Sequence, residues 1–145
     1  MEPPILGFIS PEVFIPIAES KGLIIPLVWS IYEEALQIIQ NLYKEDYKYL
    51  IVSMNVSYAQ IKEEDFVSKF IRLVTEYRVA FENIGNEITE SILIDDFDAI
   101  NKKLKMLIDK GISIYLDDFG VGYSSLERIK YLPLIISKLT CHLRI

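Results

Sequence analysis

The sequence predicts an α/β fold in which parallel strands alternate with helices. Short apolar segments rich in Val, Ile and Leu lie near residues 50, 85, 113 and 135, and such segments are typical of buried strands. Longer segments with helical periodicity separate them. Because parallel strands are joined by crossover helices, we expect a sheet of about four parallel strands with intervening helices.

The composition restricts the class of protein. The chain has 145 residues, enough for one domain, and its formal net charge of −6 argues against a protein that binds duplex nucleic acid. The longest apolar run, residues 22–29, contains Pro26 and is far shorter than the ~20 residues of a membrane-spanning helix. Cys141 is the single cysteine, and the first residues do not resemble a secretory signal. We therefore expect a cytoplasmic protein with no membrane segment in this chain.

Four helices are predicted from apolar positions that recur every three or four residues. They are expected at residues 10–22, 26–43, 64–76 and 96–110. Ser10 followed by Pro11 is a typical helix start, and Gly111 is typical of the position just after a helix. The helix at 26–43 has enough apolar positions to be buried on more than one side.

Four strands are predicted between these helices. They are expected at residues 49–57, 84–91, 112–117 and 134–139. In the first, Asn55 lies near the end of the strand, on the face opposite Met54. In the second, Glu87 lies in mid-strand, where a carboxylate is unfavourable unless it is paired or bound to a cation. Gly85 and Asn86 predict that this second strand is weakened.

Adjacent carboxylates lie where the third strand ends, in the segment 117–126, which reads DDFGVGYSSL. Side chains alternate along a strand, so Asp117 and Asp118 are expected to point to different sides. A hard divalent cation, which takes oxygen ligands, would relieve their repulsion. An alternative of equal weight is that one Asp caps the following helix and the other is solvated. For Asn55, the residues alone favour a strand-end amide in an Asx turn.

The DDFGVGYSSL segment resembles a signature of EAL domains, the bacterial phosphodiesterases that hydrolyse cyclic di-GMP. Other segments resemble the same family in the same order: the start of the helix at 10–22, the Asn-Val-Ser at 55–57 and the Glu-Ile-Thr-Glu-Ser at 87–91. The resemblance implies a TIM-type (βα) barrel. Residues 1–145 would be a partial EAL-like domain, lacking the N-terminal Glu-Ala-Leu segment and the C-terminal strands.

The resemblance also implies a two-metal mechanism that yields the linear dinucleotide pGpG. Asn55, Glu87 and Asp117 would hold a first Mg²⁺ or Mn²⁺. Asp118 would hold the second cation and share the bridging water. Lys138 would orient that water or stabilise the transition state, so that Asp118 and Lys138 are the expected catalytic residues.

Some positions differ from the family pattern. Val121 stands where the family usually has Thr, and Thr140 stands where it has Asp. His142 is expected to be an incidental residue near the end of the chain rather than a ligand.

Three functional interpretations remain open at this point. The chain could be an active phosphodiesterase whose ligand is cyclic di-GMP, a degenerate module that binds a nucleotide or a protein partner without turnover, or an inert structural fragment. The first is disfavoured because the family supplies further ligands from segments outside these residues. A sheet of about four strands leaves hydrophobic edges open, so we also expect a homo-oligomer.

Overall fold

The computed structural model describes residues 7, 9–89, 92, 96–117 and 135–136. Within them, four parallel strands form one sheet in the order β1-β2-β3-β4. The strands are β1 (Val52–Asn55), β2 (Ile84–Thr89), β3 (Ser113–Asp117) and β4 (Ile135–Ile136). The predicted α/β architecture with a parallel sheet is therefore confirmed.

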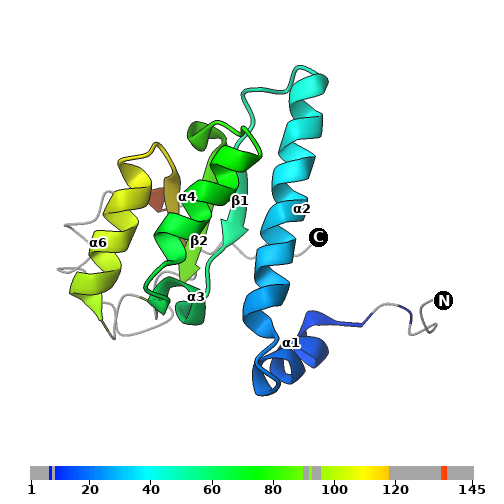
Figure 1. The fold of residues 1–145 in the computed structure, drawn as a ribbon, viewed down its shortest axis with the longest axis vertical. Coiled ribbons are helices and arrows are strands. Elements are labelled where there is room, and N and C mark those ends of the chain that lie inside the picture. Colours follow the sequence, from blue (N-terminus) through cyan, green and yellow to red (C-terminus); the bar gives the residue numbers. More distant parts are fainter. Residues whose placement is uncertain (1–6, 8, 90–91, 93–95, 118–134, 137–145) are drawn as a thin grey trace.

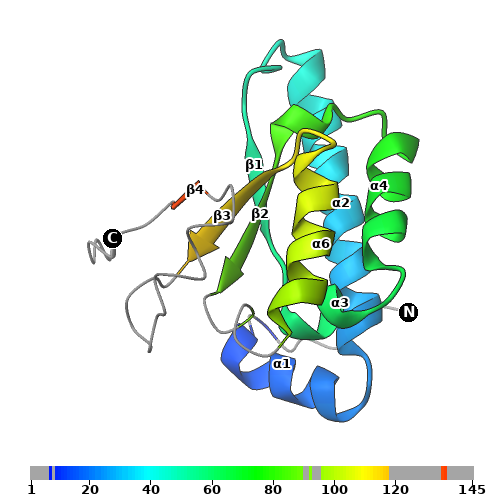
Figure 2. The ribbon, with the colours of Figure 1, turned by 90° about the vertical axis from the view of Figure 1, so that its left-hand side faces the viewer.

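Helices lie before the first strand and between the first three strands in the chain, and three of them pack on one side of the sheet (Figures 1 and 2). The helices are α1 (Pro11–Ser20), α2 (Ile24–Lys44), α3 (Tyr58–Lys62), α4 (Phe66–Glu76), the 3₁₀ turn η1 (Phe81–Asn83) and α6 (Phe97–Ile108). The long helix α2 and the helices α4 and α6 cover one face of the sheet (Figures 1 and 2). The short helices α1 and α3 lie near the end of the sheet to which the strand arrows point (Figure 2).

Where residues are described, the predicted helix and strand ends agree with the structure to within about three residues, a normal spread for element ends. Residues 90–91, 134 and 137–139 of the predicted strands lie outside the described residues. The largest difference is at β1, which is shorter than predicted because residues 49–51 precede the strand and are exposed. A side chain holds this backbone: Asn83 Nδ2 donates to the carbonyl oxygens of Lys48 and Leu50, at 2.8 Å each. Helix α3 was not predicted.

The hydrophobic core lies between the sheet and the helices. Aromatic rings join α2 to α4 within it, with ring centroids 5.4 Å apart for Tyr32 and Phe70 and 5.9 Å apart for Trp29 and Phe66. Tyr32, Phe66 and Phe70 are almost fully buried. Each such ring contributes about 1.5–3 kcal/mol by burial alone, so this contact fixes the position of α2 against the rest of the fold.

Gly85 makes room for an aromatic ring on the open face of the sheet, which is the face that the described helices do not cover (Figure 2). A Cβ atom at this position would lie 2.3 Å from Cε2 of Tyr115 and 3.3 Å from Cβ of Ser53, and the first of these is a clash. The Tyr115 ring, from the neighbouring strand, therefore leans across the backbone of β2 where a side chain would otherwise stand. β2 pairs with strands on both sides, so Gly85 and Asn86 do not interrupt its hydrogen-bonded ladder.

Asn86 is a buried polar residue on the helix-covered face of β2. Its side chain is fully buried, and neither the amide oxygen nor the amide nitrogen has a hydrogen-bond partner among the described residues. Its neighbours across the sheet are Met54 and Ile114, both apolar and buried. Burial of an amide without a partner costs about 1–3 kcal/mol, so Asn86 is a destabilising residue within an intact strand.

Replacing Asn86 with Val should raise the free energy of unfolding by about 1–2 kcal/mol. The substitution removes the unsatisfied amide and introduces a residue with a high preference for strands. Urea unfolding followed by circular dichroism measures the change, as a shift of the midpoint at constant slope.

Asn83→Val is the matched control, because Asn83 is also a buried asparagine but its amide is hydrogen-bonded to two carbonyl groups. This substitution should lower the free energy of unfolding by about 1–3 kcal/mol, since it leaves two part-buried carbonyl groups without their donor. Equal destabilisation by both substitutions would show that the Asn86 amide has a partner in solution, and would contradict the argument.

Candidate functional site

Three polar side chains that the sequence singled out lie on adjacent strands at the carboxyl end of the sheet. Asn55 is the last residue of β1 and pairs in register with Glu87 on β2. Asp117 is the last residue of β3 and pairs with Thr89, so it lies one side-chain repeat beyond Glu87. Paired positions share a face of the sheet. The intervening residues of each strand, whose side chains point to the other face, are buried under the helices. The three side chains therefore lie together on the open face.

Ser53 holds the Glu87 carboxylate in place. The Ser53 hydroxyl donates a hydrogen bond of 2.6 Å to Glu87 Oε1, and Ser53 lies two residues before Asn55 on the same face of β1. Glu87 is half-buried. The mid-strand carboxylate thus has the polar partner that its position requires. This contact between Ser53 and Glu87 was not predicted from the sequence.

The peptide group that follows Asn55 is held at both ends. Its carbonyl oxygen accepts a hydrogen bond of 2.9 Å from the hydroxyl of Tyr32 on α2. Its N–H, which belongs to Val56, donates a hydrogen bond of 2.8 Å to the carbonyl oxygen of Glu87. One peptide plane therefore connects helix α2, the end of β1 and the middle of β2.

Gln60 completes this network from α3. Its Nε2 donates to the Tyr32 hydroxyl at 2.9 Å, and its Oε1 accepts from the backbone N–H of Ser57 at 2.8 Å. Ser57 and Gln60 form a capping box at the start of α3. The Ser-x-x-Gln spacing is visible in the sequence and is the signal that could have predicted this helix.

Burial raises the pKa of the Tyr32 phenol to about 12, and the hydrogen bond from Gln60 opposes this shift only in part. The hydroxyl therefore stays protonated at ordinary pH and donates to the Asn55 carbonyl group. A buried tyrosine with both a donor and an acceptor contact has its polar atom fully used.

The other predicted site residues, Asp118 and Lys138, lie outside the described residues. Within the part of the chain that the structure describes, no group of three or more His, Cys, Asp or Glu side chains could hold a metal ion. The described carboxylates at the sheet edge are Glu87 and Asp117, and the third polar group is the amide of Asn55. These are oxygen donors, the type that Mg²⁺ and Mn²⁺ prefer, so the described set fits such a cation in the kind of ligand it offers.

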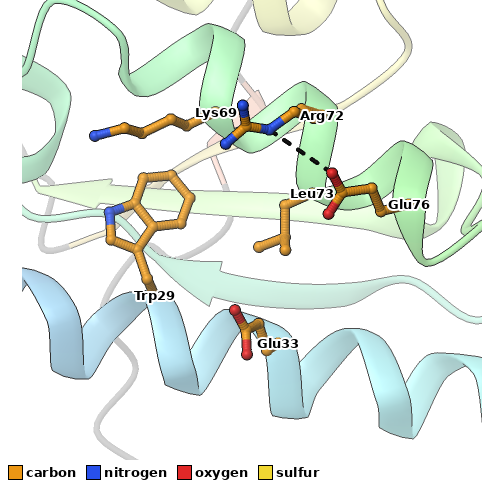
Figure 3. A pocket seen from close by; sticks show the side chains of 6 residues that line it. All are labelled: Trp29, Glu33, Lys69, Arg72, Leu73 and Glu76. Carbon is orange, nitrogen blue, oxygen red and sulfur yellow. Dashed lines mark ion pairs between the residues drawn. The ribbon is translucent and has the colours of Figure 1, made fainter.

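A separate hollow of about 260 Å³ lies between α2 and α4 on the helix side (Figure 3). It is lined by Trp29, Glu33, Lys69, Arg72, Leu73 and Glu76. Its cations already have acidic partners: Lys69 Nζ lies 2.9 Å from Asp65, just before α4, and Arg72 Nε lies 3.8 Å from Glu76 on α4. Among the described residues, Asn55, Glu87 and Asp117 do not line this hollow, so we place the candidate site at the strand ends.

Comparison with known proteins shows the family of this chain. Residues 2–143 match the EAL domain family. The chain belongs to the EAL domain family. This confirms the resemblance carried by the segments at 55–57, 87–91 and 117–126.

Curated relatives of this EAL domain include cyclic di-GMP phosphodiesterases. It is 34% identical over 137 residues to the cyclic di-GMP phosphodiesterase PA2567 of Pseudomonas aeruginosa, covering 94% of this chain and 23% of the relative. It is 31% identical over 134 residues to the cyclic di-GMP phosphodiesterase PdeR of Escherichia coli, covering 92% of this chain and 20% of the relative. The chain therefore spans less than a quarter of either relative.

A solved structure shares the fold. The PaMucR phosphodiesterase in complex with c-di-GMP superposes with a TM-score of 0.85 at 31% sequence identity, over 92% of this chain and 54% of that one. The four-stranded sheet thus corresponds to part of a TIM-type barrel, as the resemblance to EAL domains implied. Among the described helices of this EAL domain, none has the length and apolar character needed to cross a bilayer.

Proposed function

We propose that this EAL domain acts in cyclic di-GMP signalling and that residues at the carboxyl ends of its strands take part in the hydrolysis of cyclic di-GMP. The observation that carries this proposal is the placement of Asn55, Glu87 and Asp117 on one face at the carboxyl ends of three adjacent parallel strands. Active sites of barrels of this class are built at that end. The relatives named as cyclic di-GMP phosphodiesterases support the choice of substrate.

In this proposal Asn55, Glu87 and Asp117 hold one Mg²⁺ or Mn²⁺, and Asp118 holds a second. Bound cations would lower the pKa of a water molecule and neutralise charge on the phosphate. The Ser53 hydroxyl keeps one Glu87 oxygen in a fixed direction, which leaves the other for ligation. Asn55 offers a neutral amide oxygen, so the set has two negative charges at the described positions.

The chemistry of the proposed reaction is a single phosphodiester cleavage. Water adds to one phosphorus atom of the cyclic dinucleotide, the bond from that phosphorus to the ribose 3′ oxygen breaks, and the oxygen takes up a proton. The product is the linear dinucleotide pGpG. Lys138 is proposed to orient the water or to stabilise charge on the phosphate, as an ammonium group can.

Substitutions at the strand ends test the metal site directly. Asn55→Ala and Asp117→Ala should each weaken Mn²⁺ binding about tenfold or more, because each removes an oxygen ligand. Isothermal titration calorimetry with MnCl₂ measures the affinity. Glu34→Ala, which removes an exposed carboxylate on α2, is the control and should leave the affinity unchanged. If the unsubstituted chain binds no Mn²⁺ at millimolar concentration, the metal site does not exist.

The 145-residue chain by itself should hydrolyse cyclic di-GMP at no measurable rate. Four strands line only part of the interior of an eight-stranded barrel, and sites of this class take residues from several strands. Incubation with Mn²⁺ followed by chromatographic detection of pGpG measures the rate. If the chain forms pGpG in a metal-dependent reaction that Asp117→Ala abolishes, the 145-residue chain is sufficient for hydrolysis and the prediction is wrong.

Self-association is also proposed, because one side of the fold presents apolar surface. β1 is the first strand in the sheet order, and the adjacent helix α2 exposes 48% of Ile31 and 57% of Ile38. We expect light scattering to show a dimer or larger species, which Ile38→Lys shifts toward the monomer. Met106→Lys on α6, where Met106 is 54% exposed, should not shift it. A monodisperse monomer at high concentration would contradict the proposal.

A further inference from the structure

We propose that Tyr32 is a positioning residue for Asn55, and that it sets how well the strand ends bind a divalent cation. The inference depends on the metal site proposed above, in which Asn55 supplies an amide oxygen. It starts from the two hydrogen bonds on the peptide group between Asn55 and Val56. Tyr32 acts through the backbone and does not belong to the ligand set.

The peptide group after Asn55 determines where its side chain points. Rotation of that peptide plane would turn the Asn55 carbonyl away from Tyr32 and the Val56 N–H away from Glu87 at the same time. The two hydrogen bonds, of 2.9 and 2.8 Å, therefore restrict the backbone on the carboxyl side of Asn55. The second of them ends on Glu87, another proposed ligand, so the same peptide plane fixes these two ligands relative to each other.

Tyr32 can hold this plane because Tyr32 is itself held. Its ring lies 5.4 Å from that of Phe70 and 5.6 Å from that of Trp29, measured between centroids. Its hydroxyl accepts a hydrogen bond from Gln60 Nε2, and Gln60 is anchored to the backbone of Ser57. Tyr32 and Gln60 are each 1% exposed, so bulk water has little access to replace either contact. The core therefore fixes the position of Tyr32, and Tyr32 in turn restricts the peptide group at the end of β1.

Removing only the hydroxyl tests this inference. Tyr32→Phe keeps the ring packing, but it leaves the Asn55 carbonyl without its donor and Gln60 Nε2 without its acceptor. We expect Mn²⁺ affinity to fall about tenfold, the range seen when a group that orients a metal ligand is removed. Calorimetric titration with MnCl₂ measures this without any need for catalytic turnover.

The matched control is Tyr43→Phe, on the same helix about three turns further along. The Tyr43 hydroxyl also makes two hydrogen bonds, donating to Asn83 Oδ1 and accepting from the backbone N–H of Ala80. These contacts lie before β2 begins, at the opposite end of the sheet from Asn55. A general loss of stability would affect both variants, so both are compared by urea unfolding. Only Tyr32→Phe should change Mn²⁺ affinity.

A double substitution separates positioning from other effects. If Tyr32 acts through Asn55, then Tyr32→Phe should weaken Mn²⁺ binding in the unsubstituted chain and should have no further effect in the Asn55→Ala background. Equal weakening in both backgrounds would show that Tyr32 acts by another route and would overturn the inference.

The possible results distinguish this inference from the proposed function. If Asn55→Ala lowers Mn²⁺ affinity and Tyr32→Phe does not, the metal site stands and the positioning role is wrong. If Tyr32→Phe and Tyr43→Phe lower the affinity equally, the effect is one of stability and the positioning role is again wrong. If the unsubstituted chain binds no Mn²⁺, the proposed metal site fails, and the positioning role fails with it.

Discussion

The register between β1 and β2 is the constraint on which the described site depends. Asn55 faces Glu87 because Val52 pairs with Ile84 at the start of the two strands. A shift of one residue would turn Asn55 toward the helices and bring Met54 to the open face. The apolar residues under the helices oppose that shift, since it would expose Met54 and bury an amide. The packing of the hydrophobic core thus determines which polar groups meet at the sheet edge.

Helix α2 makes contacts that position both the carboxyl end of β1 and the segment that precedes this strand. Near the carboxyl end, Tyr32 reaches the Asn55 carbonyl group. Before the strand begins, Tyr43 contacts Asn83, whose amide in turn holds the carbonyl groups of Lys48 and Leu50. Both tyrosines combine ring packing on the core with a polar tip that satisfies backbone or amide groups. A strand at the edge of the described sheet therefore obtains from one helix some of the contacts that a second neighbouring strand would provide.

The arrangement of strands and helices could be predicted from the sequence because it depends on local periodicity. Strand alternation also placed Asn55 on the face opposite Met54, and in the structure Glu87 is its partner in register. The contacts of Tyr32 could not be predicted in this way. Tyr32 and Asn55 are 23 residues apart, and their contact depends on how α2 packs across the sheet. In the sequence, Tyr32 is simply one more apolar position of a helix.

The same limit applies to β2, where Gly85 and Asn86 looked alike as residues that weaken a strand. They have different roles because they point to different faces. Asn86 lies among apolar side chains with no partner in the described structure, while Gly85 leaves space that Tyr115 occupies. The side chains around each residue in the structure show which of the two is destabilising and which permits packing.

The contact between Gly85 and Tyr115 has a consequence for how this sequence can evolve. A Cβ atom at position 85 would lie 2.3 Å from the Tyr115 ring, so the first substitution there meets a steric barrier unless the ring moves. A change at position 115 to a smaller residue would leave a gap over the backbone of β2. A side chain at position 85 together with a smaller residue at position 115 would avoid both the clash and the gap. We therefore expect the two positions to covary among relatives, although they lie on different strands and 30 residues apart in the chain.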